Sequence, residues 1–197
     1  MKYRDIQSIH EEAVVDSFKG YLKEQAINLV VVDRPDPPDA VVNIDGAPSW
    51  VEITDAFQSA EWAQSITSYA ADDKTHKPYT RKLIYEPDIQ SCEKVQEVIL
   101  KKVTKDTMKV LSKTKGLGIL LVGIYTPLIS PEEIIDLAGS SINVAIKEHD
   151  PVFSSIYLYT NTEGGHAFLL SCVDCMQTKP VSLALCDRWV SFQSADL

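Results

Sequence analysis

Residues 33–54, which read DRPDPPDAVVNIDGAPSWVEIT, constrain the fold of this chain more than any other stretch. A short β-branched run at 29–32 leads into three prolines that end it, and residues 40–44 form a second apolar run. Asp45-Gly46, a strong signal for a tight hairpin turn, separates this run from a third one. The sequence therefore predicts a strand, a proline bend, a second strand, a tight turn and a third strand.

Amphipathic helices and further strands are predicted on both sides of this unit. Apolar residues recur every three to four positions in the predicted helices, and Ser130 followed by Pro131 is a favourable helix start. Asp55 is a candidate cap for the helix that follows the three strands. The predicted helices cover residues 5–25, 55–71, 91–113 and 130–147, and the further strands cover 118–125, 152–160 and 167–172.

Length and composition are those of one ordinary globular domain spanning 1–197. The chain has 197 residues, of which 45% are hydrophobic, enough for a full core. No apolar run approaches the roughly 18 residues that span a bilayer, and the start of the chain is too charged for a secretory signal. We therefore expect a cytoplasmic protein with no membrane partner.

The charge is distributed unevenly along the sequence. The formal net charge is −9, which argues against nonspecific coating of nucleic acid. Residues 74–115 nevertheless hold eleven Lys and Arg against five Asp and Glu, a local balance of +6 that leaves −15 for the rest. Lys101, Lys105 and Lys109 are four residues apart on the predicted helix, as a solvated face or a phosphate-binding face would be.

The four cysteines predict buried thiols rather than a zinc site. Cys172 and Cys175 have the two-residue spacing of zinc and redox sites, and their nearest further partners are Cys186 and His166. Without a second such pair, reduced thiols are favoured over zinc. A structural disulfide is disfavoured in a protein that stays inside the cell.

Asp39 and Glu52 fall at the ends of two adjacent predicted strands. Either residue alone is typical of a turn or a strand end, but together they offer two carboxylates on a rigid base. Phosphodiester hydrolysis uses a hard divalent cation with oxygen ligands, and Mg²⁺ keeps several waters, so two carboxylates and a backbone carbonyl such as that of Ile53 suffice. The pair is a candidate half of a metal site.

The predicted elements follow the order helix, three strands, helix, buried strand. Pro38-Asp39 is followed, after twelve intervening residues, by Glu52-Ile53-Thr54. This order and these residues resemble the PD-(D/E)xK nuclease superfamily. More narrowly, RPDPPDAVV followed by WVEIT is similar to a bacterial and phage group of nuclease-like proteins with a PDxPD element and a VEVT-like strand end. The resemblance implies an α/β, restriction-endonuclease-like core in αβββαβ order, with a central mixed sheet flanked by helices.

The resemblance also implies site residues and a cofactor. Asp39 and Glu52 would bind Mg²⁺ or Mn²⁺, and Glu12 or Glu11 from the first helix would be an additional, often water-bridged ligand. The superfamily pattern expects a lysine where this chain has Thr54, which can donate a hydrogen bond but carries no charge.

Several members of the superfamily place that lysine on the following core helix. Lys102 is the first candidate here, with Lys101 and Lys105 close by. Gln96 and Gln58 are polar alternatives. The four histidines share no spacing, so none is assigned to catalysis.

The predicted function is metal-dependent hydrolysis of phosphodiester bonds in DNA, with RNA a weaker candidate. One alternative keeps the fold without catalysis, as a nuclease-like module that binds nucleic acid or protein. Another is a protein-interaction domain of the immunity or antitoxin type, whose acidic surface would suit a basic target. The expected partner is nucleic acid, and a homodimer remains open.

Overall fold

A computed structural model describes residues 2–80, 86–126, 129–162 and 165–171 of the chain. Cys172, Cys175 and Cys186 lie outside this described part. The helices are α1 (Tyr3–Glu24), α2 (Ala60–Ala70), α3 (Pro87–Thr104), α4 (Asp106–Lys115) and α5 (Pro131–Lys147). The strands are β1 (Leu29–Asp33), β2 (Ala40–Ile44), β3 (Ala47–Phe57), β4 (Gly118–Tyr125), β5 (Phe153–Thr162) and β6 (Gly165–Ser171).

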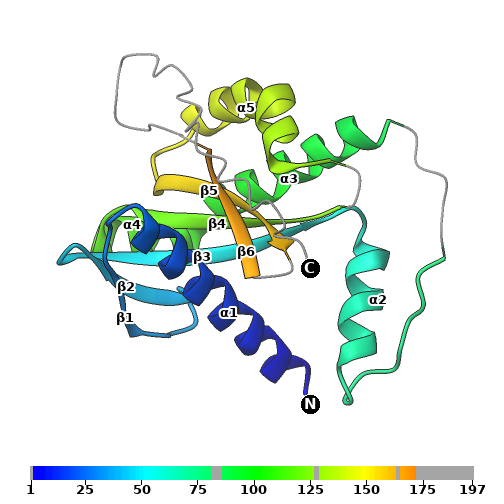
Figure 1. The fold of residues 1–197 in the computed structure, drawn as a ribbon. Coiled ribbons are helices and arrows are strands. Elements are labelled where there is room, and N and C mark those ends of the chain that lie inside the picture. The colour runs from blue at the N-terminus through cyan, green and yellow to red at the C-terminus, as the bar shows by residue number, and fades with distance from the viewer. Residues whose placement is uncertain (1, 81–85, 127–128, 163–164, 172–197) are drawn as a thin grey trace, which may run out of the picture.

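One mixed sheet organises the molecule, with its strands in the order β1-β2-β3-β4-β5-β6 (Figure 1). The first three strands are antiparallel, β3, β4 and β5 run parallel, and β6 returns antiparallel to β5. The prediction of an α/β fold with a mixed sheet flanked by helices is confirmed. Of the helices in the described residues, none has both the length and the apolar character that crossing a membrane requires.

The three-strand unit forms as the turn residues predict. Asp45 and Gly46 have φ values of 49° and 85°, the left-handed conformation that a two-residue hairpin turn requires. The turn pairs Ile44 with Ala47, and the ladder of β2 with β3 ends where Ala40 pairs with Val51. Beyond Val51, β3 therefore continues without β2 beside it.

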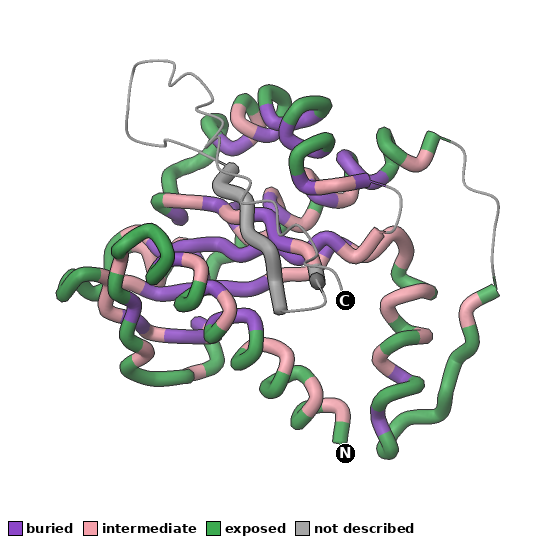
Figure 2. The backbone as a smooth tube through the Cα atoms, viewed as in Figure 1, coloured by how far each residue is buried: buried purple, intermediate pink, exposed green. Residues whose placement is uncertain are grey.

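The core has two layers, one on each face of the sheet (Figure 2). On one face, α1 packs Val14, Val15, Phe18 and Leu22 onto the sheet. On the other face, α3 and α5 pack against the strands, with Ile99 and Ile134 among their buried residues. Because side chains of a strand alternate between faces, Val51 and Ile53 face α1, whereas Trp50 and Ala56 face α3.

The predicted helix at 55–71 is wrong in its first five residues. Asp55 lies in β3, which pairs with β4 as far as Phe57, so Asp55 is not a helix cap. Helix α2 begins at Ala60, and the cap is Ser59, whose hydroxyl accepts a hydrogen bond from the Trp62 N–H at 3.1 Å. Pairing with the buried strand β4 outweighs the weak helical pattern of these residues.

The single helix predicted at 91–113 is two helices. Lys105, with φ −66° and ψ 125°, separates α3 from α4. In one continuous helix Val103 and Met108 would point in different directions, but the break lets both become buried. Lys101, Lys105 and Lys109 therefore do not form one helix face.

Candidate functional site

Glu52 is a buried carboxylate in the middle of β3. It lies on the face that α3 covers, and the residue is 3% exposed. Its Oε1 accepts a hydrogen bond, whereas its Oε2 is buried without a hydrogen-bond partner in the described structure. Burying a charged oxygen without a partner is costly, so this atom is a candidate position for a ligand.

Lys102 is the residue that approaches Glu52. Its Nζ donates to Glu52 Oε1 at 2.6 Å, and its side chain is 19% exposed. Lys102 lies near the end of α3, three positions after the buried Ile99, and therefore at the edge of the apolar stripe of the helix. The fold thus joins two residues that are 50 positions apart in the sequence.

Asp39 lies just before β2, at the place where β3 loses its neighbouring strand. Its Oδ2 accepts a hydrogen bond from the Ile53 N–H at 2.6 Å. The N–H and C=O of a strand residue point to the same edge, so the Ile53 carbonyl also faces this side. Burial, and then the charge of Glu52, raise the pKa of Asp39 to about 7, although the Ile53 hydrogen bond opposes the rise.

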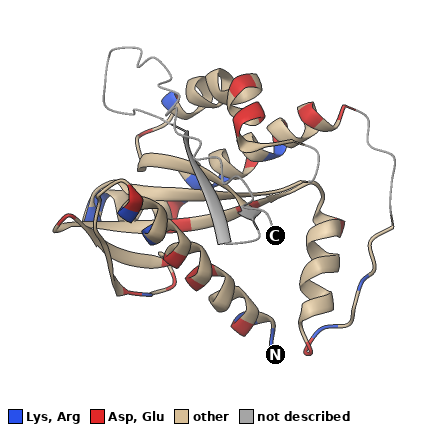
Figure 3. Cartoon of the chain, viewed as in Figure 1, with Lys and Arg blue, Asp and Glu red and all other residues tan. Residues whose placement is uncertain are grey.

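Helix α1 brings Glu11 rather than Glu12 toward this pair. Glu11 is half-buried, and its charge is close enough to contribute to the raised pKa of Asp39. Gln7 Nε2 donates to Glu11 Oε1 at 2.8 Å and holds the side chain. Glu12 is exposed. Acidic residues recur along α1 (Figure 3), and of these Glu11 is the one whose charge contributes to the raised pKa of Asp39.

Thr54 follows Glu52 by two residues in β3 and is half-buried, with Val122 of β4 as its partner in the ladder. By the alternation of a strand it points to the same face as Glu52. The charge that Thr54 lacks is present nearby as the Lys102 ammonium.

The donor set fits a hard divalent cation. Asp39, Glu52 and Lys102 together carry a net charge of −1 when all are ionised, and Glu11 adds a further negative charge. No group of three or more His, Cys, Asp or Glu that could enclose a metal occurs in the described residues. The two carboxylates, one of which has the unpartnered Glu52 Oε2, and the Ile53 carbonyl nevertheless suit Mg²⁺, which retains waters and binds substrate oxygens.

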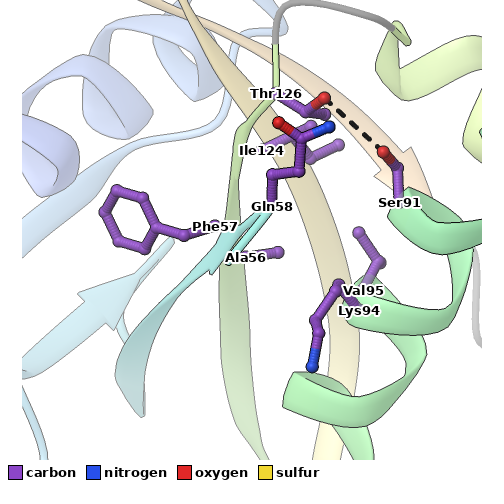
Figure 4. Close-up of a pocket in the computed structure, with 8 residues that line it drawn as sticks. All are labelled: Ala56, Phe57, Gln58, Ser91, Lys94, Val95, Ile124 and Thr126. Atoms are coloured by element: carbon purple, nitrogen blue, oxygen red, sulfur yellow. Dashed lines mark hydrogen bonds between the residues drawn. The ribbon is translucent and has the colours of Figure 1, made fainter. Parts of the chain in front are cut away.

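Gln58, one of the polar alternatives to Lys102, belongs to a different part of the molecule. It follows the last residue of β3 and lines a small pocket with Ser91, Lys94 and Thr126 (Figure 4). Ser91 Oγ donates to Thr126 Oγ1 at 3.5 Å, while the buried Gln58 Nε2 lacks a partner in the described structure. Gln58 therefore does not approach Glu52 along the face of α3.

Sequence reasoning missed a polar cluster on the α1 face of the sheet. His10 Nε2 and Asp55 Oδ2 are 3.1 Å apart, and the Tyr159 hydroxyl donates to Asp55 Oδ1 at 2.8 Å. The hydrogen bond to Asp55 raises the pKa of His10, although burial opposes the rise. The signal available in the sequence was Gly123, a residue without a side chain inside the apolar strand β4.

Cys92 is the cysteine that the structure describes. It is buried and free, and burial raises the pKa of its thiol. The remaining three cysteines fall outside the described residues, so the choice between thiols and zinc stays a prediction there.

Comparison of the chain with protein-family models, with curated proteins and with solved structures returned no match.

Proposed function

We propose that this protein is a metal-dependent nuclease with a restriction-endonuclease-like core, and that Asp39, Glu52 and Lys102 form its active site. The observation that carries the proposal is the 2.6 Å contact of Lys102 Nζ with Glu52 Oε1, beside a second carboxylate whose pKa is raised to about 7. Perturbed carboxylates that share a site with a cation are typical of catalytic centres.

Each residue has a role that follows from its position. Asp39 and Glu52 provide oxygen ligands, with the Ile53 carbonyl beside them and Glu11 as an outer negative group. A bound Mg²⁺ or Mn²⁺ would polarise the scissile phosphate and lower the pKa of a water. Lys102 supplies the positive charge that Thr54 lacks, stabilising negative charge on the phosphate as the bond breaks.

DNA is the proposed substrate, with RNA second. Support comes from the lysines of α3 and α4, two helices that belong to the basic segment 74–115, and from Lys102 of α3, which contacts Glu52 at the acidic site. Phosphates are attracted by lysines, whereas the overall charge of −9 disfavours binding elsewhere on the surface.

The test is cleavage of supercoiled plasmid, single-stranded DNA and RNA by the purified protein with Mg²⁺, Mn²⁺ or EDTA. We expect cleavage with either cation and none with EDTA. Asp39→Asn, Glu52→Gln and Lys102→Met should each lower the rate by roughly a hundredfold or more. Lys101→Met is the matched control, because Lys101 is exposed on the same helix, and should retain activity. Absence of cleavage by the wild type, or full activity of Asp39→Asn, would overturn the proposal.

A nuclease-like binding module without catalysis is the second candidate. The observation in its favour is that Thr54 is uncharged and that the Lys102 ammonium is already bonded to Glu52. Binding of DNA that depends on Asp39 and Mn²⁺, without cleavage of any substrate, would identify this function instead.

A further inference from the structure

We propose that His10, Asp55 and Tyr159 form a polar latch that holds the N-terminal half of α1 on the sheet and thereby fixes the position of Glu11, the residue that follows His10. The positioning role of the latch rests on the proposed metal site, which Glu11 would support. The latch itself is defined by three side chains from α1, β3 and β5.

The latch crosses three neighbouring strands in one row. Asp55 of β3 pairs with Gly123 of β4, and Gly123 pairs with Tyr159 of β5. The Tyr159 hydroxyl reaches across β4 to donate to Asp55 Oδ1 at 2.8 Å. A Cβ at Gly123 would lie 2.4 Å from Asp55 Oδ1 and 2.7 Å from the Tyr159 oxygen. Glycine in the central strand is therefore what leaves space for this hydrogen bond.

The latch fastens the half of α1 that the apolar core does not hold. The buried residues of α1 in the described structure all come from its C-terminal half, starting at Val14. In the N-terminal half, His10 contacts Asp55 at 3.1 Å, and its ring meets the Tyr125 ring edge-on at 6.2 Å. Strand β6 also runs beside α1. At the N-terminus of α1, the Tyr3 N–H donates to Asp73 Oδ1 at 2.8 Å.

Glu11 follows His10 directly in α1. A shift of the helix that separates His10 from Asp55 must also move Glu11 relative to Asp39, whose pKa responds to the charge of Glu11. The Tyr159 residue is buried, and its hydroxyl contributes to the latch through Asp55 Oδ1 at 2.8 Å and His10 Nε2 at 3.4 Å rather than through contact with a ligand. Asp55 and Tyr159 are accordingly positioning residues.

Calorimetric titration of Mn²⁺ tests the link to Glu11. Tyr159→Phe removes only the hydroxyl, and Asp55→Asn removes the charge that faces His10; each should weaken Mn²⁺ binding by roughly tenfold. In a Glu11→Gln background the same changes should have less than about a twofold effect, because the residue that the latch positions is then neutral. Tyr69→Phe is the control, since Tyr69 is 82% exposed. Equal losses in both backgrounds, or no loss in the wild type, would overturn the positioning role.

Amide hydrogen exchange on the metal-free protein tests the latch independently of the metal. Tyr159→Phe should accelerate exchange in residues 5–13 of α1 and leave residues 15–24 unchanged. Unchanged exchange in the first segment would overturn the latch. If exchange responds as expected but the wild type binds no Mn²⁺, the metal site fails, and the positioning role fails with it, whereas the latch stands.

Discussion

At the scale of single residues, the site places like charges where water is scarce. Asp39 and Glu52 repel one another, and the Lys102 ammonium compensates only one negative charge. A buried ion pair in such a place contributes little net stability, because desolvation offsets the attraction. This small net stability agrees with the proposed metal site, in which the two carboxylates would serve as ligands.

The raised pKa of Asp39 predicts how stability depends on pH in EDTA. Because this pKa rises from 3.8 to about 7 on folding, the native protein binds more protons than the unfolded chain between these values. The free energy of unfolding should therefore fall as pH rises from about 4 to 7 through this group. Asp39→Asn removes the effect. Between these pH values the free energy of unfolding of the variant should therefore rise relative to that of the wild type by a few kcal/mol, on the order of 1.4 kcal/mol per pKa unit. Urea unfolding of both proteins at pH 4.5 and pH 8 measures this change. If the free energies of unfolding of variant and wild type differ by the same amount at both pH values, the prediction is contradicted.

Removal of Lys102 should leave Glu52 as an uncompensated buried charge. Lys102→Met is expected to lower the free energy of unfolding at pH 8 by about 3 kcal/mol. Glu52→Gln in the same chain should recover most of this loss, since the buried charge is then gone. Lys101→Met should change stability by less than about 0.5 kcal/mol because Lys101 is exposed. Equal urea midpoints for the two lysine variants would show that the ion pair has no such role.

At the scale of elements, two glycines differ in whether the fold needs them: Gly123 in β4 leaves space for neighbouring side chains, whereas Gly20 in α1 does not. Gly123→Ala should lower the free energy of unfolding by about 2 kcal/mol, because the new Cβ would lie 2.4 Å from Asp55 Oδ1 in a packed core. Gly20→Ala should raise it by about 1 kcal/mol, because Gly20 lies within α1 with nothing within 4 Å of a Cβ. Both are measured by urea unfolding, and a neutral Gly123→Ala would contradict the close approach.

Elements with strong local signals could be predicted from sequence. The Asp45-Gly46 turn fixes the hairpin, the β4 run is apolar throughout, and Ser130 caps α5 through the Glu133 N–H at 3.2 Å. Local sequence patterns did not predict the secondary structure correctly where tertiary contacts determine it. Asp55 is strand because β4 lies beside it, and the helix breaks at Lys105 because the core accommodates residues on both sides of the break.

At the scale of the whole molecule, only part of the site could be predicted. Asp39 directly precedes β2 and Glu52 lies on the neighbouring strand β3, so the hairpin of β2 and β3 brings them together by short-range rules. The choice of Lys102 depended on resemblance, since nothing local relates α3 to β3. The contact of His10 with Asp55 could not be predicted, because it requires the register of β3, β4 and β5 and the placement of α1 together.

Cation binding should stabilise the whole fold. If Asp39 and Glu52 bind Mn²⁺ only in the native state, Mn²⁺ at a hundred times its Kd adds about 2.7 kcal/mol to the free energy of unfolding. The melting temperature should then rise with Mn²⁺ concentration in the wild type and return to its initial value with EDTA. Asp39→Asn should show no comparable rise, and an equal rise in that variant would assign the ion to another place.

The most direct test of the central claim is an anomalous difference map from crystals grown with Mn²⁺. We predict one strong peak within bonding distance of Asp39 and Glu52, close to the Ile53 carbonyl and with the Lys102 ammonium beside the cation. A map without a peak at these carboxylates, at a Mn²⁺ concentration that saturates any binding in solution, would contradict the account.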